Sequence, residues 1–225
     1  YLLFDAGPKT RHGFDAGEKV VLPQLRGLGV SKIRQLIISH SDADHAGGQA
    51  VLEQRFRIEG VTDSSALACL QGQAFEFDEV TFRYSRWGKA QTQNDGSCQL
   101  SIEGFGYKML LAGDIGVEAE MALLPELPHG IDLLLAPHHG SRSSSSPALL
   151  NQLMPKWVVF SMGSDNPFGH PHPEIVTRYQ NRGSRLLFTG QQGAVEFAAD
   201  DSGIHLISFA RSEYARFWLA SQPNH

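Results

Sequence analysis

The sequence lacks the features that identify several common classes of protein. No apolar run approaches the roughly 18 residues that a membrane-spanning helix needs. The two cysteines, Cys69 and Cys98, are too far apart for a Cys-x-x-Cys metal or redox motif. The formal net charge of -5 argues against a general basic surface for nucleic acid, although it permits a local one.

The composition is that of an ordinary folded protein. Hydrophobic residues make up 41% and charged residues 19% of the 225 residues, which is enough apolar material for a substantial core. We expect one domain over residues 1–225, and because Tyr1 already lies in a predicted strand, we expect it to be part of a longer polypeptide. Cys69 and Cys98 are either a disulfide or two buried thiols, and the residues alone leave both possibilities open.

Hydrophobic periodicity predicts an α/β fold. Apolar or alternating runs predict strands at residues 1–5, 33–38, 99–103, 107–112, 131–136, 157–161, 185–189, 194–197 and 204–209. The alternation over residues 75–83 predicts a hairpin that turns at Asp78 and Glu79. Helical spacing of apolar residues predicts helices at residues 18–28, 49–55, 116–124 and 174–181. We therefore expect layers of helices and sheets, with the polar residues that follow the strands meeting at one edge.

The strongest chemical signal is the segment SHSDADHAGG at residues 39–48, directly after a predicted strand. Two imidazoles and two carboxylates within six residues are costly to hold together without a cation. The alternative is a polar surface loop, but the preceding strand and the further ligands along the chain favour a metal site. The predicted ligands are His40, Asp42, Asp44 and His45.

Two later strands also end in residues that can bind metal. The strand at residues 107–112 leads into Asp114, whose two carboxylate oxygens can bridge two ions; a helix N-cap is the alternative role and is compatible with bridging. The strand at residues 131–136 leads into His138 and His139. Of these two we predict that His138 is the ligand and that His139 lies behind the ligands or contacts phosphate.

Loops on either side are predicted to complete the site. His170, in the proline- and glycine-rich loop at residues 163–173, is predicted to contact the substrate or donate a proton. The serine-rich loop at residues 142–146 contains no nucleophile with its own base. Asp5 is either a turn residue or a supporting residue near the metals.

These motifs resemble the metallo-β-lactamase superfamily and, more narrowly, the soluble domain of the ComEC competence proteins, which are inner-membrane channels of DNA uptake. The resemblance rests on DAG at residues 5–7, SHSDADHAGG at 39–48, NDGS at 94–97, PHHGS at 137–141 and NPFGHP at 166–171. It implies an αββα sandwich that lacks the family's first strand, which would precede Tyr1. It also implies a periplasmic or other extracytoplasmic location, which favours a disulfide between Cys69 and Cys98.

The resemblance also implies a function. It implies metal-dependent phosphodiester hydrolysis by a nuclease that degrades the DNA strand not taken up during natural transformation. The partners would be single-stranded DNA, the membrane channel part of the same polypeptide and other competence proteins. Asp44 or Asp114 would orient the attacking water and accept its proton, and His139 or His170 would stabilise or protonate the leaving oxygen. Substrate contacts are expected from Asn94, Ser141, Arg142 and Asn166, with Asp5 and Ser97 as structural residues near the site.

The chain departs from the superfamily pattern at one of two expected metal positions. No histidine lies between His45 and Asp114, and Asp42 stands where the superfamily usually has histidine. The position held by His40 and Asp42 is therefore richer in oxygen ligands, which favours manganese, with zinc or magnesium as alternatives. The other position has the ligands Asp44, His45 and His138, and Asp114 bridges the two.

Two other functions remain open. Relatives with the same ligand framework hydrolyse lactones, thioesters or phosphorylcholine esters, and a deep apolar pocket would favour such substrates, whereas an open basic groove would favour nucleic acid. The missing histidine is also compatible with a degenerate domain that binds DNA or gates the channel without catalysis.

Overall fold

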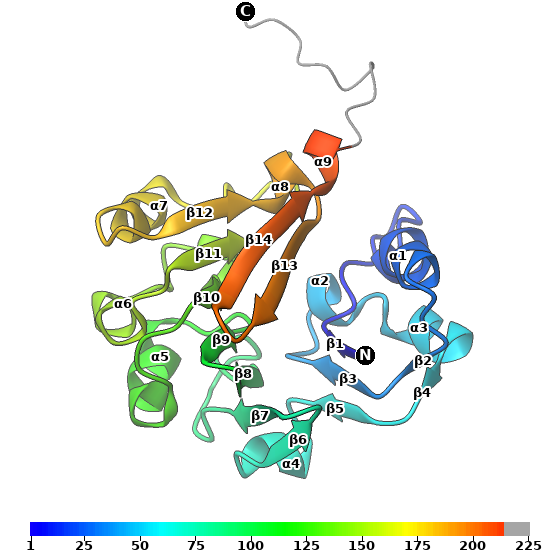
Figure 1. Cartoon of the computed structure of the whole chain (residues 1–225), viewed down its shortest axis with the longest axis horizontal. Helices are drawn as coiled ribbons and strands as arrows, with labels where there is room; N and C mark the ends of the chain where they lie inside the picture. Colours follow the sequence, from blue (N-terminus) through cyan, green and yellow to red (C-terminus); the bar gives the residue numbers. More distant parts are fainter. Residues whose placement is uncertain (214–225) are drawn as a thin grey trace, which may run out of the picture.

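The computed structural model describes residues 1–213, which form two sheets packed face to face with helices outside each (Figure 1). The smaller sheet is parallel and has the order β1-β3-β5, with β1 at Leu2–Phe4, β3 at Gln35–Ile38 and β5 at Val61–Asp63. The larger sheet has seven strands in the order β12-β11-β10-β9-β8-β7-β6. The predicted αββα sandwich is confirmed.

The seven-stranded sheet has an antiparallel half and a parallel half. Strands β6 (Ala74–Phe77), β7 (Val80–Ser85), β8 (Gln99–Gly104) and β9 (Tyr107–Leu111) pair antiparallel. Strands β10 (Leu133–Leu135), β11 (Trp157–Phe160) and β12 (Arg185–Phe188) continue from β9 in parallel. Parallel neighbours need a crossover connection, and here these connections contain the helices of the outer layer.

Helices cover both outer faces (Figure 1). The larger sheet is covered by α5 (Val117–Leu123), α6 (Pro147–Leu153) and α7 (Pro173–Gln180), with short 3₁₀ turns at Leu124–Glu126 and Pro137–Gly140. The smaller sheet is covered by a π-helical turn at Gly17–Val21, α1 (Leu22–Gly27) and α3 (Gln49–Arg55). Short α2 (Ala43–Ala46) and α4 (Leu67–Leu70) follow β3 and β5.

Three hydrophobic cores separate the layers, because side chains of a strand alternate between its two faces. In β3, Leu36 and Ile38 pack with the helices of the smaller sheet, whereas Ile37 packs between the two sheets. In β9, Leu110 packs under α5 to α7 and Leu111 packs between the sheets. The same chain segments therefore stabilise adjacent layers, and the strand ends that carry the polar motifs are held firmly.

Residues after β12 form the end of the described fold. A turn of helix, α8 (Thr189–Gln192), leads into the antiparallel hairpin β13 (Val195–Asp200) and β14 (Gly203–Phe209), and α9 (Ala210–Glu213) follows. Phe197 of β13 packs edge to face on Trp157 of β11, with ring centroids 5.6 Å apart. The hairpin therefore packs against the face of β11 opposite its helices. Within residues 1–213, no helix is long and apolar enough to cross a membrane.

Several local predictions need correction. The predicted strand at residues 33–38 is broken at Arg34: β2 (Lys32–Ile33) pairs with β4 (Arg57–Ile58) in a separate two-stranded sheet, and only β3 joins the three-stranded sheet. The predicted helix at residues 18–28 begins as a π-helical turn before it becomes α-helical. The disulfide between Cys69 and Cys98, which the resemblance favours, is confirmed, with a Cα–Cα distance of 5.9 Å.

Candidate metal centre

The predicted ligands lie where strands of both sheets end. His40 and α2 follow β3 of the smaller sheet, Asp114 follows β9, and His138 and His139 follow β10 of the larger one. A backbone hydrogen bond from the Cys98 N–H to the Ser39 carbonyl (2.7 Å) joins the loops of the two sheets. The site is therefore assembled from segments that are far apart in the sequence.

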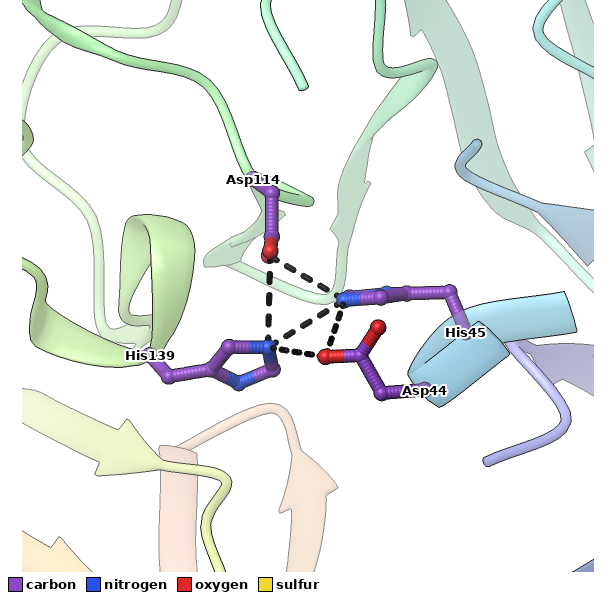
Figure 2. A group of neighbouring side chains, drawn as sticks. All are labelled: Asp44, His45, Asp114 and His139. Carbon is purple, nitrogen blue, oxygen red and sulfur yellow. Dashed lines mark hydrogen bonds and ion pairs between the residues drawn. The ribbon is translucent and has the colours of Figure 1, made fainter. Parts of the chain in front are cut away.

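Four side chains converge on one point (Figure 2). The ligand atoms of Asp44, His45, Asp114 and His139 all lie within 4.8 Å of one another, and we call these residues the metal group. Nε2 of His45 lies 3.2 Å from Oδ1 of Asp114 and 3.2 Å from Nε2 of His139. Nε2 of His139 lies 3.5 Å from Oδ2 of Asp114 and 3.4 Å from Oδ2 of Asp44.

The neighbours of each imidazole fix which nitrogen carries the proton. The Ser39 hydroxyl donates to Oδ2 of Asp5 (2.9 Å), so Nδ1 of His40, 3.0 Å from that hydroxyl, must donate to it. Nδ1 of His45 donates to Oδ2 of Asp5 (2.7 Å). A carboxylate behind the imidazole is the arrangement that orients histidine ligands in metalloproteins, because it leaves the Nε2 lone pair free for a cation.

His139 is oriented in the same way by the backbone. Its Nδ1 donates to the carbonyl oxygen of Ser161 (2.7 Å), at the end of β11, so Nε2 presents a lone pair to the metal group. The Nε2 atoms of His45 and His139 thus face each other and two carboxylates. A bound cation would satisfy both lone pairs at once.

A second buried nitrogen also fits a metal. His40 is fully buried, and its Nε2 is the one buried side-chain polar atom within residues 1–213 that lacks a hydrogen-bond partner. The nearest acidic atom is Oδ2 of Asp42, at 3.5 Å. An unpaired buried polar atom is costly, and a cation at Nε2 would remove that cost. The donor sets around both nitrogens therefore fit divalent metal.

Electrostatics within the metal group are strong. Burial disfavours charge on all three central residues, but their mutual hydrogen bonds outweigh it. Contacts with Asp114 and Asp5 raise the pKa of His45 to about 10, and contacts with Asp114 and Asp44 raise the pKa of His139 to about 9. Hydrogen bonds from His139 and His45 hold the pKa of Asp114 well below its usual range. In the absence of metal, protons on Nε2 neutralise the carboxylates, and a bound cation would replace them.

His138 lies beside the metal group rather than in it, although we predicted it as the ligand. Its Nε2 is 3.9 Å from Oδ2 of Asp114 and accepts a hydrogen bond from the Asn94 amide (3.2 Å). Both His138 and His139 have positive φ angles, 48° and 53°, so the chain turns sharply and sends the two rings to different places. The geometry assigns the place in the metal group to His139, which we predicted as a catalytic residue.

The residues predicted to support the site lie where that role requires. Asp5 contacts both Ser39 and His45, as described above. The Ser97 hydroxyl accepts a hydrogen bond from the Asp114 N–H (3.1 Å) and lies 3.4 Å from Nδ1 of His40. Ser97 therefore positions residues from both sheets.

Arg142, predicted to bind substrate, lies on the rim. Its side chain is 69% exposed, and the guanidinium group contacts Nε2 of His172 (2.6 Å) and the Glu174 carboxylate (3.7 Å). Ser141 is buried and its hydroxyl bonds to the Ser143 hydroxyl (3.0 Å), so it shapes the serine-rich loop. Their contacts with substrate stay a prediction.

The loop after β11 brings His170 to the site but uses Asn166 internally. The Asn166 amide donates to the His170 carbonyl (2.7 Å), and its oxygen accepts from the His170 N–H (2.9 Å). Burial and the neighbouring His138 lower the pKa of His170, so its ring is neutral at pH 7. A neutral imidazole is a poor proton donor, and the acid role of His170 stays a prediction.

Sequence reasoning missed two residues that shape the site. The Ser161 carbonyl orients His139, and a backbone acceptor has no signature in sequence. Glu120 of α5 is fully buried and accepts hydrogen bonds from the N–H groups of Ser145 and Ser146, which holds the loop after His139 in place. The sequence signal for Glu120 was a charged residue among the apolar residues of the predicted helix at residues 116–124.

A cavity of about 630 Å³ lies next to the metal group. Most of its lining side chains are polar or acidic, among them Asn94, Asp95, Asp114, Glu118, His138 and Ser143. The cavity reaches Asp114 and His138 and therefore gives a ligand access to the ions that these residues could hold.

Comparisons with known proteins agree with the fold and the motifs. The family model of the metallo-β-lactamase superfamily matches residues 1–68, which include the SHSDADHAGG segment. The solved structure of the metallo-β-lactamase fold protein YhfI from Bacillus subtilis covers 83% of this chain and 83% of that chain, with a TM-score of 0.51 and 13% identity. This likeness supports the fold alone.

Sequence comparison with curated proteins extends over most of the chain. Competence protein ComA of Neisseria gonorrhoeae is 30% identical over 213 residues, which cover 91% of this chain and 30% of that protein. ComE operon protein 3 of Bacillus subtilis is 26% identical over 217 residues, covering 84% and 27%. Recombination protein 2 of Haemophilus influenzae is 30% identical over 204 residues, covering 86% and 26%. The chain spans less than a third of each of these relatives.

Proposed function

This chain has the metallo-β-lactamase fold and is related to the ComEC family of competence proteins, and from that premise we propose that it is a metal-dependent phosphodiesterase that cleaves DNA. The fold and its cluster of histidine and aspartate residues are those of a metal-dependent hydrolase. The observation that carries the proposal is the metal group, which lies next to a cavity that reaches Asp114.

The metal group would hold one divalent ion. We propose that His40, Asp42 and His138 would hold a second, because Nε2 of His40 lies 3.5 Å from Oδ2 of Asp42 and lacks a hydrogen-bond partner, and Nε2 of His138 lies 3.9 Å from Oδ2 of Asp114. Bound ions would supply Lewis-acid activation of water and neutralise charge on the phosphoryl oxygens. Because the second position mixes imidazole with carboxylate oxygen, manganese is the metal we favour, with zinc and magnesium as alternatives.

The chain's own residues would bind the phosphodiester and accept or donate the protons that hydrolysis transfers. Asp44 is half-exposed and contacts the metal group, so Oδ2 can orient a water molecule and accept its proton. Hydrogen bonding to His139, which outweighs the effect of burial, lowers the pKa of Asp44 and keeps it ionised for that role. Arg142, whose exposed guanidinium pairs with Glu174, is the residue proposed to contact the phosphate backbone.

The two alternative functions are less well supported. A lactone or thioester hydrolase would need a deep apolar pocket, whereas the cavity beside Asp114 has the acidic residues Asp95, Asp114 and Glu118 in its lining. A degenerate, non-catalytic domain would lack a metal site, whereas the four ligand atoms of the metal group converge even though the His40–Asp42 position lacks the superfamily's histidine. Hydrolysis of a polar phosphodiester is the function that the site fits best.

We place this activity outside the cytoplasm, in the strand-degrading step of DNA uptake. The disulfide between Cys69 and Cys98 supports an oxidising compartment. The relative named Competence protein ComA supports a role in transformation, and we propose that the chain acts as part of a larger membrane-bound protein. The proposed partners are single-stranded DNA, the membrane part of the same polypeptide and other competence proteins.

The first test is cleavage of labelled single-stranded DNA across a manganese titration, with zinc and magnesium in parallel. We expect manganese-dependent cleavage that falls by at least about a hundredfold in Asp114→Asn, because this carboxylate faces both proposed positions. Asp132→Asn is the matched control. Asp132 is also buried, but it precedes β10, whereas His138 and His139 follow that strand, so Asp132 lies at the end of β10 away from the site. Absence of cleavage by folded protein with every metal would contradict the proposal.

A second test separates the two neighbouring histidines. His139→Ala is expected to lower metal affinity by at least about a hundredfold, since it removes one of four converging ligands. His138→Ala is expected to lower it by less than about tenfold at that position, because His138 lies outside the metal group. Competition with a chelating dye measures both affinities. Equal losses of metal affinity in the two variants would show that both imidazoles bind the metal at this position.

A further inference from the structure

An exposed aromatic ring stands at the edge of the metal centre. Phe168, in the loop between β11 and α7, is 76% exposed, more than any other large hydrophobic residue in the described part of the chain. Its ring stacks on that of His170, with centroids 6.0 Å apart and planes 19° apart. His170 in turn meets His138 edge to face, with centroids 5.8 Å apart. A row of rings therefore leads from solvent to a neighbour of Asp114.

The shape of the loop around Phe168 is fixed by contacts that do not involve the Phe168 side chain. The Asn166 side chain bonds to both the N–H and the carbonyl of His170, and its amide also lies 3.3 Å from the Gly163 carbonyl. Gly169 has a φ of 66°, a conformation that glycine adopts without strain. These contacts close the loop through backbone atoms and Asn166, so Phe168 can be changed while the loop keeps its shape.

A single exposed hydrophobic residue is common and needs no explanation by itself. Phe168 differs because its ring is near-parallel to a second ring that lies beside the proposed metal centre. A flat, exposed π-face at this place suits another flat ring. Single-stranded nucleic acid offers such rings on both sides of every phosphodiester bond, whereas a duplex hides them in its stack.

We propose that Phe168 and His170 form a stacking platform for a nucleobase of single-stranded nucleic acid next to the phosphodiester that is cleaved. This inference rests on the proposed function and names its substrate class. Stacking of this kind accepts any base, so the platform would increase affinity for single strands without sequence preference. The platform would also set the position of the nucleic-acid strand relative to Asp114.

The test measures stacking directly and does not depend on cleavage. The probe is a single-stranded oligodeoxynucleotide that contains 2-aminopurine, whose fluorescence is quenched when the base stacks. All variants carry Asp114→Asn so that the probe stays intact, and a manganese concentration is kept constant. We expect Phe168→Ala to weaken binding between about fivefold and about a hundredfold and to abolish the quenching that binding causes. Phe168→Tyr should retain both.

Two controls make the result specific. Phe105→Ala also removes an exposed ring, 43% exposed, from the β8–β9 turn, at the other end of the strand that leads to Asp114, and it should bind as the parent does. In a duplex the same probe base is already stacked and quenched, so adding the protein should cause no further change in its fluorescence. Unchanged binding in Phe168→Ala, equal weakening in Phe168→Tyr, or binding without quenching in the parent would each overturn the platform.

The outcomes also distinguish the platform from the proposed function. Cleavage by the protein without Asp114→Asn, combined with no effect of Phe168→Ala, would reject the platform and leave the nuclease standing. Quenching that depends on Phe168, combined with no cleavage under any metal, would support the platform and reject the nuclease.

Discussion

Asp5→Asn tests whether the residues behind the ligands control metal binding. The Asp5 carboxylate accepts three hydrogen bonds: one from Nδ1 of His45 (2.7 Å), one from the Ser39 N–H (2.7 Å) and one from the Ser39 hydroxyl (2.9 Å). Asparagine offers one oxygen where aspartate offers two, and its amide nitrogen cannot accept. Either Ser39 or His45 therefore loses its acceptor in the variant.

The size of the effect follows from these contacts. Loss of a carboxylate behind a histidine ligand typically lowers metal affinity by about 10- to 100-fold, which corresponds to about 1.4–2.7 kcal/mol. Asp5 has only 15% of its side chain exposed, so water replaces the lost acceptor poorly. We expect a loss near the upper end of that range, together with a decrease of about 1.5–3 kcal/mol in the free energy of unfolding.

The assay is competition for manganese between the protein and a chelating dye at fixed pH, with unfolding by urea measured in parallel. Asp132→Asn is the control, since the Asp132 carboxylate also accepts a backbone N–H, from Lys108 (2.9 Å), and a charged donor, Lys156 (2.7 Å). It should lose stability but keep its metal affinity within about twofold. Normal metal affinity in Asp5→Asn, or an equal loss in Asp132→Asn, would refute the reasoning.

Two further predictions concern stability. Because the folded-state pKa values of His45 (about 10) and His139 (about 9) exceed the unfolded value of about 6.5, their stabilisation is complete below about pH 6.5 and is lost as pH rises through 9–10. The melting temperature of the metal-free protein should therefore decrease as the pH rises from 8 to 10.5. A melting temperature that stays constant over this range would contradict the raised pKa values of His45 and His139. Replacing Cys69 and Cys98 with alanine removes a disulfide between residues 29 positions apart and should lower the free energy of unfolding by roughly 3–4 kcal/mol. Unfolding by urea measures this decrease, and a decrease below about 1 kcal/mol would contradict the prediction.

Hydrophobic periodicity was sufficient to predict most of the fold. The alternation of Phe75, Phe77 and Phe82 predicted the hairpin β6–β7, whose turn at Asp78 and Glu79 is where the pattern breaks. The pattern missed α6, although two local signals were present. Ser146 accepts a hydrogen bond from the Leu149 N–H as an N-cap, and Pro147 occupies the first turn.

The site was predictable only as far as local sequence determines it. The SHSDADHAGG segment follows its strand directly, so its ligands could be identified without knowledge of other contacts. The choice between His138 and His139 depends on left-handed backbone angles at both residues, and neither is glycine or asparagine, which would signal such angles. It also depends on the Ser161 carbonyl, which any residue at that position would provide.

The metal group joins two halves of the chain that are also linked by packing, by a disulfide and by hydrogen bonds such as that from Cys98 to Ser39. Asp44 and His45 belong to the smaller sheet, whereas Asp114 and His139 belong to the larger one. Neither half contains more than two members, so neither half alone forms a competent centre. The protein would consequently gain a complete metal centre only in the last stage of folding, when the sheets close against each other, and nascent or fragmented chains would lack it.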